Sequence, residues 1–96
     1  MGAIFNPGSI AVIGASRSRG KIGNEILRNL IYGGYEGAVY PINPKAEKVL
    51  GLKAYPSVAS VPGVIDLAVV AIPADLVLEV VRECVEKGVK GLIITT

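Results

Sequence analysis

With 96 residues, the chain can form one domain at most, and it lies near the lower size limit for an α/β fold whose sheet is covered on both faces. Hydrophobic residues make up 51% of it, yet there are only four Tyr, one Phe and no Trp, so Val, Ile, Leu and Ala dominate, as is typical of buried parallel strands. The net charge of +2 is too small to indicate a nucleic acid partner.

The residue types and segments that are missing limit the chemistry further. Without histidine, the chain has no imidazole to serve as general base, metal ligand or phosphoryl carrier. The single cysteine excludes an internal disulfide bond and a cysteine-rich metal site. No apolar run approaches the ~18 residues of a membrane-spanning helix, and no secretory signal precedes the first strand. We therefore expect a cytoplasmic protein that binds no metal and does not span a membrane.

The first half of the chain predicts a strand, a helix and a second strand. Residues 9–14 (SIAVIG) form a short β-branched run, and a loop of Ser, Gly and Arg follows at 14–20. Over residues 21–32 apolar side chains recur at helical spacing, and two glycines end the helix. Residues 37–42 (GAVYPI) predict a strand in which Pro41 is tolerable only near the end of the strand or at a sheet edge.

The second half begins with the least regular part of the sequence. Residues 45–63 contain several Gly and Pro that interrupt any long element, although residues 57–61 can form one helical turn. Residues 65–72 (IDLAVVAI) predict a buried strand. A helix that Asp75 can cap follows this strand and runs to about Lys87.

The last predicted element is a strand at residues 91–95 (GLIIT), so that strands and helices alternate along the chain. This order predicts an α/β fold, namely a Rossmann-like parallel sheet with helices on both faces that is truncated after its fourth main strand. We assign residues 1–96 to one domain of this type. Because so short a chain buries little surface, we expect its core to be shared with further chain or with a partner.

The loop between the first strand and the first helix is the first candidate binding site. A Rossmann fold holds a diphosphate at this place, because unpaired backbone N–H groups and the positive end of the helix dipole favour an anion. Ser16 stands where the usual glycine motif has its second glycine, so the spacing alone is a weak signal, and a solvated basic turn is the alternative. The candidate ligand-binding residues of the loop are Gly14, Ser16, Arg17, Ser18, Arg19 and Gly20.

The end of the second strand indicates which nucleotide is expected. A Rossmann unit that binds NAD carries an Asp or Glu about 20 residues after the glycine loop, where it accepts hydrogen bonds from the ribose. This sequence has Asn43, Pro44 and Lys45 there, and a lysine fits a phosphorylated ribose better than a free one. NADP and coenzyme A (CoA) both remain candidate ligands at this point. The alternative is that Lys45 is an ordinary exposed lysine that binds no ligand.

The second half of the chain adds a candidate wall for the ligand. Ile72 and Pro73 end the third predicted main strand at the carboxyl edge of the sheet, where α/β ligands bind, although ending the strand is an equally good role for Pro73. Cys84 belongs to the apolar side of the following helix, and we expect it to be a core residue without chemistry. The glutamates of that helix are interpreted as solvated residues on its outer side: Glu79, Glu83 and Glu86.

Taken in order, several segments of the chain resemble the CoA-binding domain of ADP-forming acyl-CoA synthetases, including the archaeal acetate-CoA ligase type and the related succinyl-CoA ligase alpha subunit. The segments are FNPGSIAVIGAS, GKIGNEILRNL, GYEGAVYPINPK, GLKAYPSV, VIDLAVVAIPADLV and EKGVKGLIITT. The resemblance implies that the first loop contacts the CoA phosphates and that Lys45 binds the ribose phosphate. It also implies that the CoA site is lined by Ile72, Pro73, Thr95 and Thr96.

The same resemblance implies a role within a larger ligase. Its members convert acyl phosphate and CoA into acyl-CoA, and the phosphoryl group passes through a histidine to ADP. That histidine belongs to a following domain, so this chain would only hold CoA and would have downstream ligase domains or a second subunit as partners, with homo-oligomers also possible. The alternatives are an NADP-binding domain of an oxidoreductase and a regulatory module that senses nucleotides.

Overall fold

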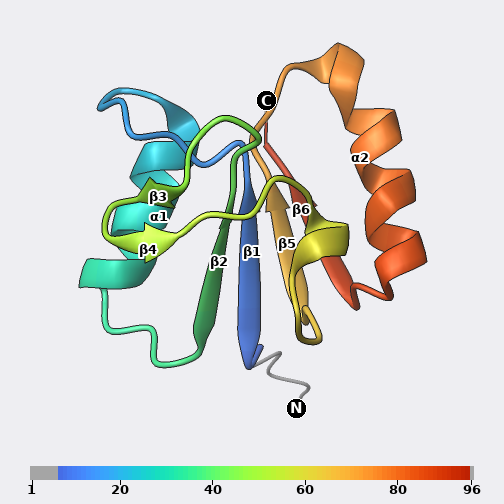
Figure 1. Cartoon of the computed structure of the whole chain (residues 1–96), viewed down its shortest axis with the longest axis horizontal. Coiled ribbons are helices and arrows are strands. Elements are labelled where there is room, and N and C mark those ends of the chain that lie inside the picture. Colours follow the sequence, from blue (N-terminus) through green and yellow to red (C-terminus); the bar gives the residue numbers. More distant parts are fainter. Residues whose placement is uncertain (1–6, 96) are drawn as a thin grey trace.

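A four-stranded parallel sheet forms the centre of the molecule (Figure 1). The structure, a computed structural model, describes residues 7–95. The strands lie in the order β2-β1-β5-β6. Their bounds are Ser9–Ile13 for β1, Ala38–Ile42 for β2, Leu67–Val70 for β5 and Gly91–Ile94 for β6.

Two helices cover the two faces of this sheet. Helix α1 (Ile22–Tyr32) connects β1 to β2, and helix α2 (Ala74–Lys87) connects β5 to β6. The two crossovers lead in opposite directions from the centre of the sheet, and right-handed crossovers in opposite directions place their helices on opposite faces. The strand order changes direction between β1 and β5, because β2 is added on one side of β1 and β5 on the other, and this switch point is where ligands bind in open α/β sheets. The predicted Rossmann-like fold is confirmed.

The alternating side chains of β1 divide the core into two parts. Ala11 and Ile13 face a cluster that includes Cys84 of α2, while Ile10 and Val12 face a cluster that includes Leu27 of α1. The predicted core position of Cys84 is confirmed, because its side chain is fully buried and this burial raises the pKa of the thiol. The central strands β1 and β5 are buried on both faces, which explains why their sequences are almost continuously apolar.

A small hairpin occupies the region in which the sequence predicted no strand. Strands β3 (Lys48–Val49) and β4 (Leu52–Lys53) pair in antiparallel fashion, and a 3-10 turn, η1 (Val58–Ser60), follows at the predicted place. Leu50 and Gly51 form the two-residue loop, and both have positive φ values, 51° and 82°, as this class of tight hairpin requires. The buried side chain of Val49 anchors the hairpin in the core on the α1 side.

Several predicted boundaries differ from the observed ones. The expected cap at Asp75 is wrong, because α2 already begins at Ala74 with Pro73 at the N-cap position, and no side chain caps it. Asp75 instead lies in the first turn, where its charge still favours the helix dipole. Strand β5 is shorter than the apolar run at 65–72 suggested. None of the helices within residues 7–95 combines the length and hydropathy needed to cross a membrane.

Candidate functional site

Two glycines bring the end of β1 and the start of α1 into close contact. Gly14 has a φ of 92°, and a Cβ at this position would collide with the backbone of Ala71 after β5. A Cβ on Gly23, in the first turn of α1, would collide with the carbonyl of Gly14. These contacts hold the start of α1 directly above the carboxyl end of β1. They serve the functions of the first and third glycines of a Rossmann motif, although the spacing differs.

The start of α1 leaves its backbone donors open. Lys21 is the N-cap residue in extended conformation, and its side chain does not cap the helix. The N–H groups of Ile22, Gly23 and Asn24 therefore have no intrahelical acceptors, and the first helical hydrogen bond runs from the Glu25 N–H to the Lys21 carbonyl. The Ser16 hydroxyl accepts a hydrogen bond from the N–H of Ser18 at 3.0 Å and keeps its own hydrogen to donate. The side chain of the buried Asn24 donates to the Ser16 carbonyl at 2.8 Å and ties the loop to the helix. This arrangement suits an anion.

A pocket of about 370 Å³ lies between this loop and the ends of β5 and β6. Lys21, Ile22 and Gly23 contribute to its wall, as does Ala71. Several residues predicted from the sequence also line it: Gly14, Ser16, Gly20, Ile72, Pro73 and Thr95. The backbone N–H and the hydroxyl of Thr95 both donate to the Val70 carbonyl, at 2.8 and 3.0 Å, and thereby fix the last part of this wall. We refer to this first pocket as the loop pocket.

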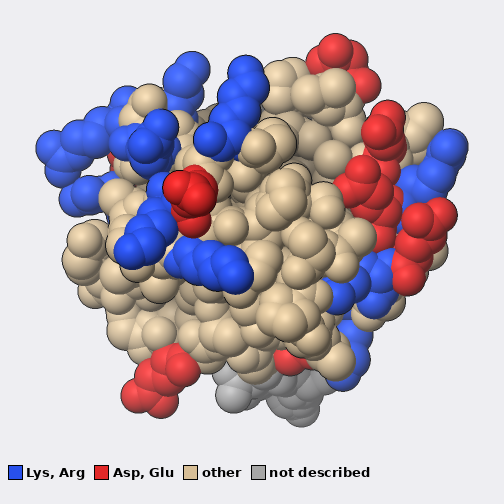
Figure 2. Space-filling model, viewed as in Figure 1, with Lys and Arg blue, Asp and Glu red and all other residues tan. Residues whose placement is uncertain are grey.

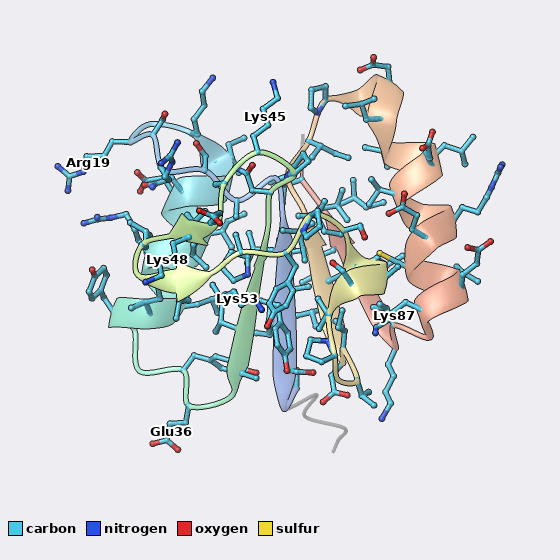
Figure 3. The ribbon with its side chains drawn as sticks, viewed as in Figure 1. Arg19, Glu36, Lys45, Lys48, Lys53 and Lys87 are labelled. Carbon is cyan, nitrogen blue, oxygen red and sulfur yellow. The ribbon has the colours of Figure 1, made fainter. Side chains whose placement is uncertain are left out.

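A second pocket, of about 570 Å³, is strongly basic. Its wall contains Arg17 from the first loop, Lys45 from the loop after β2, and Lys48 and Lys53 from the hairpin, with Glu47 as the carboxylate among them. Figure 2 shows Lys and Arg side chains gathered on the side of the molecule that carries α1 and the hairpin. In Figure 3, Lys45 rises from the loop above the strand ends, and Lys48 and Lys53 lie on the hairpin below it. We refer to this second pocket as the basic pocket.

Asn43 connects the loops that form these two pockets. Its side-chain N–H donates to the carbonyl of Ala15 at 2.8 Å, while its side-chain oxygen accepts hydrogen bonds from the N–H groups of Lys45 and Ala46 at 2.8 and 3.1 Å. Its own backbone N–H donates to the carbonyl of Tyr55 at 2.9 Å. One amide therefore sets the position of the lysine loop relative to the first loop.

A third pocket, of about 270 Å³, lies on the α2 side of the strand ends and shares Gly14 and Ile72 with the loop pocket. Most of its lining is apolar, from residues such as Ile42, Val58 and Val80. Two glutamates of α2, Glu79 and Glu83, also line it, so their predicted place on the outer side of the helix is wrong, although Glu79 is exposed as predicted and Glu83 is half-buried. Glu86 is exposed as predicted. We refer to this third pocket as the apolar pocket.

The remaining predicted residues are not part of these walls. Ser18 and Arg19 are exposed and lie outside the loop and basic pockets, and Figure 3 shows Arg19 extending away from the strand ends. Thr96 lies outside the described residues. Sequence reasoning missed Lys48 and Lys53, which are two ordinary lysines until the hairpin brings them to the basic pocket. The Leu50-Gly51 pair between short β-branched and apolar residues was the one signal for that hairpin.

Comparison with protein families shows which family the chain belongs to. The family model described as the CoA binding domain matches residues 8–96. The chain belongs to this family of CoA-binding domains. The match covers both predicted phosphate-binding loops and the residues of all three pockets within residues 13–95.

Several known proteins that resemble this CoA-binding domain are ADP-forming acetate-CoA ligases. The chain is 50% identical over 93 residues to the ADP-forming acetate-CoA ligase II of Archaeoglobus fulgidus, matching 97% of this chain and 14% of that protein. It is also 50% identical to the alpha subunit of the corresponding ligase II of Pyrococcus furiosus, of which it covers 20%. It superposes with a TM-score of 0.91 and 52% identity on the acetyl-coenzyme A synthetase 1 of Candidatus Korarchaeum cryptofilum, solved with phosphate and ADP, covering 96% of this chain and 20% of that one. The chain thus spans a fifth or less of the length of these relatives.

Proposed function

We propose that this chain binds CoA across the carboxyl ends of its sheet and positions it for acyl transfer within a larger ADP-forming ligase. The observation that carries the proposal is the adjacency of two pockets on either side of one loop, one with open backbone donors and one lined by cations. Ser16 and Gly20 of this loop line the loop pocket, while Arg17 lines the basic pocket. CoA carries a diphosphate and a separate phosphate on its ribose, so it needs two such pockets a short distance apart.

The diphosphate belongs in the loop pocket. The open N–H groups at the start of α1 and the hydroxyl of Ser16 supply donors, and Lys21 supplies charge. The proposed contacts are with Gly14, Ser16 and Gly20. Thr95 and Pro73 form the opposite wall, along which the pantetheine arm can leave the sheet.

The ribose phosphate belongs in the basic pocket, against Lys45 and Arg17. Asn43 presents the Lys45 loop toward the first loop through its three side-chain hydrogen bonds. A cation at the place where an NAD-binding unit has a carboxylate favours a phosphorylated ribose. Membership in the CoA-binding family then favours CoA over NADP.

The adenine base belongs in the apolar pocket. This pocket shares Gly14 and Ile72 with the loop pocket, and Pro44 stands on its wall one residue before Lys45. A ligand can therefore place its diphosphate, ribose and base in three neighbouring spaces. Apolar walls suit a purine ring.

The acyl transfer itself needs residues beyond those of this chain, which has no histidine to carry a phosphoryl group. Its relatives are much longer, and we propose that further ligase domains or a second subunit supply the chemistry while this domain holds the CoA thiol in place. Apolar side chains on α2 and β6 support such a contact. Leu78 and Val85 of α2 are 71% and 69% exposed, and Ile93 of β6 is 50% exposed, so large apolar side chains are open to contact on both elements.

Calorimetric titration with CoA, 3′-dephospho-CoA and NADP tests the proposal. We expect CoA to bind most tightly, with the ribose phosphate contributing about tenfold in affinity through its charged hydrogen bonds. Lys45→Ala should remove most of that advantage, whereas Arg82→Ala, which removes an exposed cation from α2, should not. Absence of CoA binding, or tighter binding of NADP than of CoA, would contradict the proposed function.

A further inference from the structure

We propose that the β3–β4 hairpin is the second wall of the ribose-phosphate site, with Lys48 and Lys53 binding the same phosphate as Lys45. The inference rests on the proposed function, because it assumes that CoA is the ligand. It adds an element that the family's first-loop and lysine motifs do not contain. The hairpin would make the site selective for a phosphorylated ribose rather than merely tolerant of one.

The pairing of the two lysines is the first observation. Lys48 lies directly opposite Lys53 in the antiparallel register of the hairpin, and like charges in this arrangement destabilise a strand pair. Among residues 7–95, the ion pair between Lys90 and Asp66 is the only one within 4.0 Å, so neither hairpin lysine forms an ion pair with a carboxylate of this part of the chain. An anion held between the two lysine side chains would remove the repulsion.

The rigidity of the hairpin is the second observation. Leu50 and Gly51, with φ values of 51° and 82°, form a two-residue turn that fixes the register of the two strands. Val49 anchors the hairpin in the core, and the Ala54 N–H donates to the Glu47 carbonyl at 2.8 Å, which extends the pairing by one rung. The hairpin therefore presents its lysines from a fixed backbone.

The surroundings of Lys53 and Lys45 complete the site. The Lys53 ammonium lies 5.2 Å from the centre of the Tyr55 ring, which limits where this side chain can go. Lys45 faces the same basic pocket from a loop that Asn43 holds, and Arg17 faces it from the first loop. Four cations and one carboxylate thus line the pocket. A phosphate monoester carries close to two negative charges at neutral pH, and it matches this excess better than the singly charged phosphates of a diphosphate do.

The test compares Lys48→Ala, Lys53→Ala and the double variant in calorimetric titrations with CoA and with 3′-dephospho-CoA. We expect each single variant to weaken CoA about three- to tenfold while changing dephospho-CoA less than twofold, because only CoA carries the phosphate. The variants Lys48→Arg and Lys53→Arg keep the charge and should restore most of the affinity for CoA. Arg82→Ala is the matched control, since it removes the same charge from α2.

The outcomes separate this inference from the proposed function. If the wild-type chain prefers CoA but the hairpin variants weaken both ligands equally, or weaken neither, the inference is wrong and the proposed function stands. If the wild-type chain does not bind CoA, both are wrong. Circular dichroism of each variant should match the wild type, and the arginine variants provide a folded comparison if an alanine variant does not.

Discussion

The two crossovers of the sheet share a topology but differ in how their helices begin. In β1–α1–β2, two glycine contacts hold the start of α1 close to the sheet, and its first N–H groups remain open. In β5–α2–β6, Pro73 begins the helix, and the outer side of α2 exposes large apolar residues. Figure 2 shows the same contrast in charge, with basic side chains over α1 and the hairpin and mostly acidic ones over α2.

The contrast between the two crossovers indicates that a strand-helix connection alone does not make a phosphate site. A helix start becomes an anion site when small residues bring it onto the strand end and no side chain caps it. The start of α2 also has no side-chain cap, but it lacks the close glycine contacts, because Pro73 and Ala74 stand where the first crossover has small residues packed against the strand end. It contributes a wall to the apolar pocket and a surface suited to a protein contact instead. Substitutions in each crossover should therefore have different consequences for stability, CoA affinity and self-association.

The largest effect is expected from Gly23→Ala. The new methyl group meets the Gly14 carbonyl, which cannot move without shifting β1, so we expect a loss of about 2 to 3 kcal/mol in the free energy of unfolding. CoA affinity should fall as well, because the start of α1 is displaced. Urea denaturation and calorimetry measure the two effects.

Gly34→Ala is the matched control for that variant. Gly34 has a φ of 88°, and a Cβ at this position would meet nothing within 4 Å beyond its chain neighbours, so only the left-handed backbone conformation opposes alanine, at about 1 kcal/mol. CoA affinity should not change, since Gly34 follows the far end of α1. If Gly23→Ala proves as mild as Gly34→Ala, the close contact is not what holds the phosphate loop.

An intermediate effect is expected from Asn43→Ala, which removes the amide that joins the loop after β1 to the loop that carries Lys45. The hydrogen bonds to Ala15 and Lys45 are lost, so stability should fall by about 1 to 2 kcal/mol. The affinity ratio of CoA to 3′-dephospho-CoA should also fall, because Lys45 loses its fixed position. Asn29→Ala, on the exposed side of α1, is the control. A lower melting temperature with an unchanged ratio would show that Asn43 supports the fold only.

The smallest effect on the domain itself is expected from Leu78→Lys combined with Val85→Lys. Both side chains are more than two-thirds exposed, so their replacement should leave the fold and CoA affinity unchanged. We expect the wild-type chain to self-associate in sedimentation experiments through this surface and the double variant to do so less. A wild-type chain that stays monomeric at high concentration would argue against an interface at α2.

Sequence reasoning found the elements that have a long apolar pattern and missed those that do not. Strand β1 and helix α1 are visible because their side chains repeat over several residues, whereas β3 and β4 have two residues each and show no period. The cap at Asp75 was wrong because the preceding proline already provides the extended residue from which the helix starts.

The site shows the same limit. Ser16, Lys45 and Pro73 could be predicted because each follows a strand or precedes a helix at the carboxyl edge. Lys48 and Lys53 could not, because only the hairpin brings them to the basic pocket. Glu79 and Glu83 were assigned to the outer side of α2, yet the helix is oriented so that both border the apolar pocket.

Whether CoA lies across the carboxyl ends of the sheet can be read from backbone amide chemical shifts while the ¹⁵N-labelled chain is titrated with CoA. We expect the largest changes at Ser16, Ile22 and Gly23 around the loop pocket and at Lys45 and Lys48 around the basic pocket. Changes confined to the outer side of α2 or to β6, with the amides at the start of α1 unaffected, would show that CoA binds elsewhere.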